Sequence, residues 1–482
     1  MIRISQLKLK VGHTREELFE EIIHQAHGKR PVSWRIVRKS VDARKKPQLF
    51  YVYTIDAEFE NEKKLLSAKK SKWTRSTVVK YRFPYNKKDG SGASSTEVST
   101  IDRAVIVGMG PAGLFAALVL ARAGFAPIVF ERGDCVEKRS ELVEHFFESG
   151  ELDEESNVQF GEGGAGTFSD GKLNTLVKDK TGRNGEVLKT FVQFGAKDSI
   201  CYVNKPHIGT DELRHIVKNI RQEIIRLGGE IRFRTRLTDL LVQEEKDQRK
   251  LTGITLNETE RLDTDVLVLA VGHSARDTFA MLYEKDLAMS AKAFAVGYRM
   301  EHPQTMINQD LYGEPENDYL GAASYKVTHT LENGRGVYSF CMCPGGYVVN
   351  ASSEEGMLAV NGMSYQARDS RNANSAIIVT VNPSDFPEEG VLGGIALQRK
   401  LERAAWEAGN GKVPVQLFKD YCAHKKSIKL GDVSPCIKGA YTLTDVRSIF
   451  PKEIGDSIEA GIHAFGKKLS GFDRPDALLE GV

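Results

Sequence analysis

Three glycines after a short apolar run have the spacing that lets a protein backbone approach a phosphate. They are Gly108, Gly110 and Gly113, within the segment Arg103–Gly133, which reads RAVIVGMGPAGLFAALVLARAGFAPIVFERG. The first glycine permits a tight turn, the second lets a pyrophosphate come close, and the third lets the next helix pack against the strand. The residue types and their spacing therefore predict a dinucleotide site.

Two further residues fit this motif. Pro111 falls in the first helical turn, where its missing N–H costs nothing and the free amides of that turn would face the phosphates. Glu131 ends the next predicted strand, about 20 positions further on, where a carboxylate suits a ribose hydroxyl and disfavours a 2′-phosphate. The alternative is a glycine turn that only packs a strand against a helix, which leaves these two residues unexplained.

The motif does not separate FAD from NAD, so the chain that follows it matters. An amphipathic helix is predicted over 211–229, then short strands, and then an apolar strand that ends in a glycine turn at 265–272, DVLVLAVG. This order resembles flavoproteins in which a returning strand leads back to the flavin. A second glycine-rich stretch, GEGGAG at 161–166, precedes TFSDGKLNT, which cannot form the apolar helix of a second dinucleotide site, although its amides could approach a cofactor.

The predicted elements divide the chain into four parts. Residues 1–98 run strand, helix, strand, strand, helix and a last strand at TVVKYRF, which indicates a small ferredoxin-like (βαββαβ) domain with a Gly/Ser-rich linker. Residues 99–284 would form the first part of a Rossmann-type FAD-binding domain, 285–435 an inserted antiparallel-sheet substrate domain, and 436–482 a return to the FAD-binding domain. The predicted fold class is therefore α/β and α+β.

The composition is that of an ordinary globular protein. The 482 residues are 41% hydrophobic and 27% charged, and no apolar run reaches the ~18 residues of a membrane span, so we expect a cytoplasmic protein without a membrane partner. Six scattered cysteines fit a reducing compartment. Residues 1–100 hold about 22 Lys and Arg against about 11 Asp and Glu. This basic charge invites a nucleic-acid partner, but no RNA-binding signature accompanies it, and a solvated surface is the simpler interpretation.

Five residues are candidates for chemistry beside a flavin, where the protein supplies orientation, an acid or base, and a charge. Lys172 follows the glycine-rich loop, His207 lies in KPHIG, and His273 follows the returning strand, with packing or surface roles as the alternatives. Cys341 and Cys343 would share one face of a strand with Cα atoms ~6.5 Å apart, so a disulfide would be strained. They are either a redox pair facing the flavin or small core residues. Two ligands do not make a zinc site, so no metal is predicted.

Five motifs together resemble one bacterial family. They read FGEGGAGTFSDGKL, KPHIGTDEL, AVGHSARD, FCMCPGGYVVNASSE and NGMSYQARDSRNANSA. Over almost its whole length the chain resembles the uncharacterised FAD-dependent dehydrogenases, also labelled NAD(FAD)-utilising dehydrogenases. The resemblance implies that FAD is held by Gly108, Gly110, Pro111, Ala112, Gly113, Glu131, Arg132, Arg139, Gly163, Gly164, Ala165, Gly166, Thr167 and Gly272.

The sequence thus predicts a FAD-dependent oxidoreductase that acts on a small molecule by hydride or electron transfer. NAD(P)H would be a diffusing electron donor or acceptor without a domain of its own. The family pattern ends with a glycine-rich segment that caps the flavin, and since this chain ends at FDRPDALLEGV, we expect a C-terminally shortened form. The alternative is a non-catalytic flavin- or nucleotide-binding protein whose basic first domain docks a partner or RNA. Neither the substrate nor the oligomeric state follows from the residues.

Overall fold

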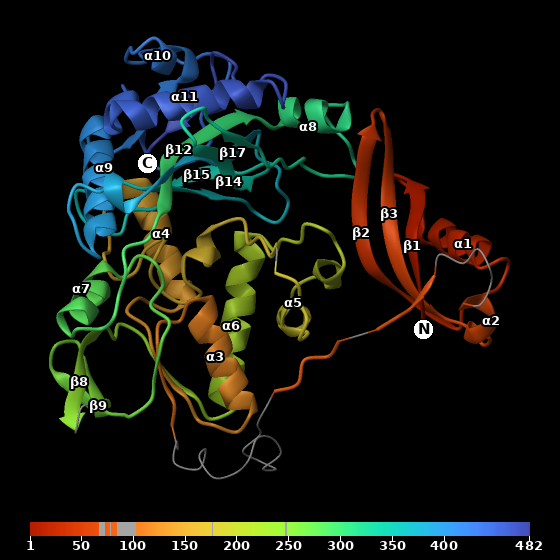
Figure 1. The fold of residues 1–482 in the computed structure, drawn as a ribbon, viewed down its shortest axis with the longest axis horizontal. Coiled ribbons are helices and arrows are strands. Elements are labelled where there is room, and N and C mark those ends of the chain that lie inside the picture. Colours follow the sequence, from red (N-terminus) through yellow and green to blue (C-terminus); the bar gives the residue numbers. More distant parts are fainter. Residues whose placement is uncertain (67–72, 78, 84–102, 176, 246–247) are drawn as a thin grey trace.

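Five sheets with flanking helices make up the described part of the chain (Figure 1). The structure is a computed structural model that describes residues 1–66, 73–77, 79–83, 103–175, 177–245 and 248–482. The mixed α/β class is confirmed. Within these residues no helix is both long and apolar enough to cross a bilayer.

The first unit is a four-stranded antiparallel sheet with two helices, red in Figure 1. Its element order is the predicted one, and Thr14 caps the first helix through reciprocal hydrogen bonds with Glu17. The last strand predicted over 77–83 is wrong for the described residues, because pairing with the first strand ends at Arg75. The elements are β1 (Ile2–Lys10), α1 (Arg15–Gln25), β2 (Ser33–Lys45), β3 (Gln48–Glu58), α2 (Glu62–Leu66) and β4 (Thr74–Arg75), in the sheet order β2-β3-β1-β4.

The second unit is built on a parallel sheet of order β11-β5-β6-β7. Two of its helices, α3 and α6, lie side by side against this sheet (Figure 1), because their apolar faces share one buried core with the strands. A separate sheet of order β10-β9-β8 forms the excursion between β7 and β11. The elements are β5 (Val105–Val107), α3 (Pro111–Arg122), β6 (Ile128–Phe130), α4 (Val136–Ser149), α5 (Arg183–Gln193), α6 (Thr210–Arg226), β7 (Glu230–Arg232), β8 (Leu237–Glu245), β9 (Gln248–Leu256), β10 (Glu260–Asp263), β11 (Leu267–Leu269) and α7 (Arg276–Glu284).

The third unit is a seven-stranded sheet of order β13-β14-β17-β12-β21-β18-β20, beside a small sheet of order β16-β15-β19. The elements are β12 (Phe294–Pro303), α8 (Gln304–Tyr312), β13 (Thr328–Thr330), β14 (Gly336–Cys343), β15 (Tyr347–Asn350), β16 (Val360–Met363), β17 (Asn372–Val381), α9 (Gly393–Gly409), β18 (Val413–Leu417), α10 (Phe418–Cys422), β19 (Ile437–Lys438), β20 (Tyr441–Leu443), α11 (Lys452–Gly466) and β21 (Leu478–Glu480).

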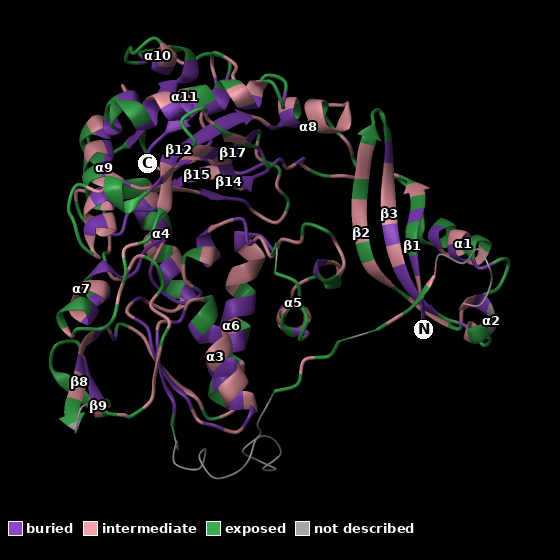
Figure 2. Ribbon diagram, viewed as in Figure 1, coloured by how far each residue is buried: buried purple, intermediate pink, exposed green. Residues whose placement is uncertain are grey.

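The end of the chain completes this seven-stranded sheet. The sequence predicts that residues 436–482 return to the parallel-sheet domain, and the strand pairing differs from that prediction. Strand β21 pairs with β12 and β18, and its two leucines, Leu478 and Leu479, are fully buried there. Helix α11 lies over the sheet (Figure 2), and its residues Ile458 and Ile462 are buried in the core that the helix shares with the sheet. Burial of these side chains in one core explains why residues 436–482 belong with the third unit.

Candidate cofactor site

A cavity of about 1040 Å³ lies between the parallel sheet and the third unit. On one side it is lined by the residues that follow β5, β6 and β11, and on the other by residues of β12, β14, β16 and β17. Ligands of parallel α/β sheets bind at these carboxyl ends, and the volume lies at the upper end of the range for ligand sites. The position and size fit a dinucleotide.

The three motif glycines have three different surroundings. A Cβ on Gly108, whose φ is +95°, would lie 2.3 Å from the Ala270 carbonyl oxygen, and one on Gly113 would lie 1.8 Å from the Gly108 carbonyl oxygen. A Cβ on Gly110 would meet only the Gly164 Cα, at an ordinary 3.7 Å. Gly108 and Gly113 are therefore required for packing, whereas Gly110 borders the open cavity at the amino end of α3, where amides can receive a phosphate.

Glu131 ties the glycine turn to the second glycine-rich loop. Its carboxylate accepts hydrogen bonds from the amides of Met109 at 2.7 Å, Gly133 at 2.9 Å and Gly161 at 3.1 Å. The residue is buried, yet it lines the cavity. Because a carboxylate offers about four acceptor positions, one remains for a ribose hydroxyl.

Arg139 contacts the glycine-rich loop on the side that faces away from the cavity. It does not line the cavity, contrary to the predicted contact with FAD. Its guanidinium donates to the carbonyl oxygens of Asn157 at 2.8 Å, Glu162 at 2.7 Å and Gly164 at 3.0 Å. Burial lowers the pKa of Arg139 to about 9. It is a positioning residue that fixes the loop.

Three other predicted FAD residues also stand behind the cavity wall. They are Gly113, Gly163 and Thr167, and a Cβ on Gly163 would lie 2.1 Å from the Thr167 hydroxyl oxygen. The remaining predicted FAD residues all line the cavity: Gly108, Gly110, Pro111, Ala112, Glu131, Arg132, Gly164, Ala165, Gly166 and Gly272.

A cluster of charged and sulfur-bearing side chains joins the second unit to the third, and two of its members, Arg299 and Cys341, line the cavity. The Lys172 ammonium lies 3.6 Å from the Cys343 sulfur and 2.9 Å from the Asp170 carboxylate. Arg299 donates to the Cys341 carbonyl oxygen at 2.7 Å and lies 3.5 Å from the Cys343 sulfur. The structure thus brings together three of the five predicted catalytic residues.

The two cysteines do not share a flat strand face. The register of β14 against β17 shifts between Phe340 and Cys343, and Cys341 has a φ of +43°. This bulge leaves Cys341 in the cavity wall and Cys343 fully buried behind it, so the expectation from regular alternation is wrong here.

Neither histidine side chain joins this cluster, although the backbone of His207 forms a β-bridge with that of Lys172. His207 donates to the Gln366 carbonyl oxygen through Nε2 at 3.1 Å and lines a separate cavity of about 350 Å³. Since a carbonyl only accepts, Nε2 carries the proton there. His273 lines the main cavity beside Gln398. Burial lowers the pKa of both histidines, so both are neutral at pH 7.

Arg299 is the main site residue that the sequence interpretation missed. It is 3% exposed, lines the cavity and lies in the central strand β12. The signal was an arginine at an inward position of the alternating segment FAVGYRM, since a buried charge in a strand requires partners.

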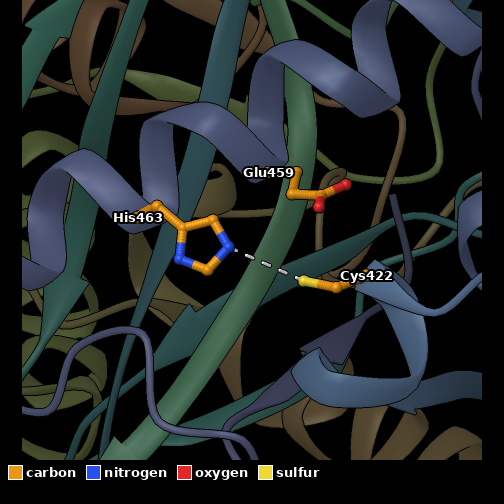
Figure 3. Close-up of side chains that lie close together, drawn as sticks. All are labelled: Cys422, Glu459 and His463. Carbon is orange, nitrogen blue, oxygen red and sulfur yellow. Dashed lines mark hydrogen bonds between the residues drawn. The ribbon is translucent and has the colours of Figure 1, made fainter.

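A second side-chain cluster lies away from the cavity, where no metal site was predicted (Figure 3). Glu459 and His463 project from one face of α11 toward Cys422 of α10, with their ligand atoms within 4.8 Å of one another. Glu459 is already paired with Arg447 at 2.5 Å, and burial raises the pKa of Cys422 to about 12. These residue types can bind a divalent ion. To do so, Glu459 would have to break its ion pair with Arg447, and Cys422 would have to lose its proton.

Comparisons with known proteins agree with this geometry. The fold and the cavity define the class as a mixed α/β protein with a glycine-lined ligand site. Residues 293–482 match the family described as FAD-dependent protein, C-terminal domain-like, and residues 1–58 match a domain of unknown function. A protein of Clostridium beijerinckii, described as uncharacterized, is 45% identical over 487 positions, which cover 100% of this chain and 89% of that protein. The chain belongs to the same family as this clostridial protein.

Solved structures show weaker similarity. THI4 of Thermovibrio ammonificans is 18% identical with a TM-score of 0.26, and the match covers 40% of this chain and 66% of that one. The L-amino acid deaminase from Proteus vulgaris is 12% identical with a TM-score of 0.24, covering 51% of this chain and 62% of that one. The matches thus span less than two thirds of the solved chains, and similarity of this size identifies no shared activity.

Proposed function

We propose that the protein is a FAD-dependent oxidoreductase that transfers a hydride or an electron pair between a small-molecule substrate and the flavin. The observation that carries the proposal is the open space beside Gly110. This space is part of the cavity, and residues of the segment that matches an FAD-dependent domain family line the opposite side of that cavity. The parallel-sheet unit would hold the nucleotide, and the third unit would present the substrate. NAD(P)H would serve as a diffusing electron partner.

The residues present fit this cofactor. The amides at the amino end of α3 and the backbone of Gly164 would face the pyrophosphate, and Glu131 would accept from the ribose. Bound FAD would supply two-electron chemistry that side chains lack. The protein would contribute a fixed positive charge, because Lys172 stays protonated: burial lowers its pKa, but the neighbouring Cys343, Cys341 and Asp170 raise it by more.

The first test is the visible spectrum of the purified chain after mixing with excess FAD and desalting. We expect flavin bands to survive desalting in the wild type and to be lost in Gly110→Ala. The added methyl group has room in the fold, since its nearest neighbour would be 3.7 Å away and Gly110 has an ordinary φ of −68°. It would, however, occupy the position where a pyrophosphate must approach.

Gly185→Ala is the matched control. This glycine lies in α5, outside the cavity, and its added Cβ would meet nothing closer than 3.8 Å. The control should retain flavin like the wild type. Equal flavin retention in all three chains would place the nucleotide elsewhere, and no retention in the wild type would refute the proposed cofactor.

A further inference from the structure

We propose that Cys341 and Cys343 form a redox-active dithiol–disulfide couple that exchanges an electron pair with the flavin, with Cys341 facing the cavity and Cys343 as the resolving thiol. The electron partner at this side of the site would then be a thiol or disulfide substrate. This inference rests on the proposed function, since it assigns the flavin of that proposal as the other redox group.

The backbone places the two sulfurs at different depths of one site. The bulge in β14, with Cys341 at a φ of +43°, exposes Cys341 to the cavity and keeps Cys343 behind it. The Cys343 thiol donates a hydrogen bond to the Cys341 carbonyl oxygen at 3.4 Å, so the two residues stay in contact. A left-handed conformation at a non-glycine residue costs free energy and is typical of functional sites. Two small core residues would need neither the bulge nor this conformation.

Charged neighbours favour a thiolate at this pair. The neighbouring Cys343 thiol lowers the pKa of Cys341 to about 5 despite burial, and the positive charges of Lys172 and Arg299 lower it further. The pKa of Cys343 is raised, because Cys341 is its neighbour and the residue is buried. The negative charge of Asp170 disfavours a thiolate at Cys341, but the positive charges of Lys172 and Arg368, which contact this carboxylate, offset it. At pH 7 the pair would therefore carry one thiolate, which is the nucleophile of thiol–disulfide exchange.

The redox step involves the two cysteines, the flavin and one proton from solvent. In the oxidative direction the S–H bond of Cys343 breaks, the S–S bond forms between Cys341 and Cys343, and two electrons leave the pair for the oxidised flavin. The proton of Cys343 and one proton from solvent accompany them to give the reduced flavin. In the reverse direction the disulfide is reduced to the dithiol, and the Cys341 thiolate attacks the sulfur of an external disulfide, which releases one thiolate before Cys343 completes the exchange.

The first test uses the full chain without flavin. The tryptic peptide 336–368 contains both cysteines and no other. In graded mixtures of reduced and oxidised dithiothreitol, we expect this peptide to lose and regain two hydrogen atoms reversibly, as measured by mass spectrometry. Iodoacetamide at pH 6 should modify Cys341 about twofold faster in the wild type than in Lys172→Met, because a rise of about one unit from a pKa of about 5 lowers the thiolate fraction at pH 6 from about 0.9 to about 0.5. Two free thiols in every mixture would overturn the inference.

The second test asks whether the couple communicates with the flavin. The chain reconstituted with FAD should take up two electron pairs in an anaerobic dithionite titration, whereas Cys343→Ser should take up one; Cys422→Ser, a cysteine outside the cavity, should behave as the wild type. A chain that holds FAD but takes up only one pair overturns this inference and leaves the proposed function standing. A chain that forms the disulfide but holds no FAD overturns the exchange together with the proposed function.

Discussion

Glu480 is a fully buried carboxylate, and neither of its oxygens has a hydrogen-bond partner in the described structure. It pairs in register with Arg299 across β21 and β12, next to Glu301. Burial raises the pKa of Glu301 to about 7, and burial together with Glu301 raises that of Glu480 well above its ordinary value. The native state therefore holds protons here that the unfolded chain releases near pH 4.5.

Replacing Glu480 with glutamine tests this buried pair. A folded-state pKa above the unfolded one means that stability is fully present below pH 4.5 and falls as the pH rises through about 7 and beyond. Glu480→Gln should match the wild type near pH 5 and gain on the order of 1–3 kcal/mol at pH 8, measured by urea unfolding at both pH values. The exposed control Glu389→Gln should keep the wild-type pH dependence. An equal gain at pH 5 and pH 8 would show that Glu480 is not protonated in the native state.

At the scale of elements, the loop over 157–168 depends on one side chain of α4. Five hydrogen bonds join the Arg139 guanidinium to carbonyl oxygens of this loop, and the guanidinium stacks over Phe168 at 4.8 Å. The loop supplies Gly164, Ala165 and Gly166 to the cavity wall. Its shape, and therefore the cavity, should be lost with the arginine.

Arg139→Met should lower the free energy of unfolding by about 3–5 kcal/mol, because several buried carbonyl oxygens lose their donor. It should also abolish flavin retention, although Arg139 does not line the cavity. Denaturant unfolding and the desalting assay measure the two effects. Arg226→Met, on the exposed face of α6, should change neither. Full flavin retention in Arg139→Met would mean that the loop keeps its shape without this side chain.

Helix α11 packs against β14 through a glycine. A Cβ on Gly461 would lie 2.4 Å from Cγ1 of Val337, so Gly461→Ala should destabilise the protein by about 1–3 kcal/mol. Val337→Ala makes room, and the double variant should be more stable than the sum of the single effects predicts. Urea unfolding of the four chains gives the coupling. Additive effects would indicate that the helix shifts away from the sheet.

The sequence predicted those elements that have clear periodicity or capping signals. The glycine turn around Gly110, the helix over 211–229 and the apolar strand over 265–272 carry such local signals, and all three are found. Strand β21 has only three residues, so its place between β12 and β18 depends on burial and not on a repeating pattern. The bulge at Cys341 depends on how β14 meets β17, a contact that local sequence does not specify. For the same reason the sequence indicates each of the two glycine-rich loops, but it does not indicate the hydrogen bonds by which Glu131 joins them.

At the scale of the whole molecule, the first unit meets the rest of the chain through few contacts. Backbone hydrogen bonds join Lys39 to Tyr202 and Asn204 at 2.7 and 2.9 Å, and the tip of the β2–β3 hairpin reaches Asp310 of α8 through Lys46 (Figure 1). None of its described residues lines the cavity. The segment 79–83, however, belongs with the second unit, since Tyr81 and Phe83 line an apolar groove with side chains of α3 and α5.

Two shortened chains separate these contributions, one beginning at residue 79 and one at residue 99. Both should retain flavin, because the cavity is complete without the first unit. The chain from residue 99 lacks Tyr81 and Phe83, which leaves Phe115 and Leu118 of α3 uncovered in the groove. It should therefore unfold at a lower urea concentration, with a loss of about 1–2 kcal/mol for partly buried aromatic side chains, and self-associate more readily in sedimentation experiments.

If only the full chain retained flavin, the first unit would have to hold the other two in place through its contacts with Tyr202, Asn204 and α8. Equal stability of both shortened chains would instead show that Tyr81 and Phe83 add nothing to the α3 surface.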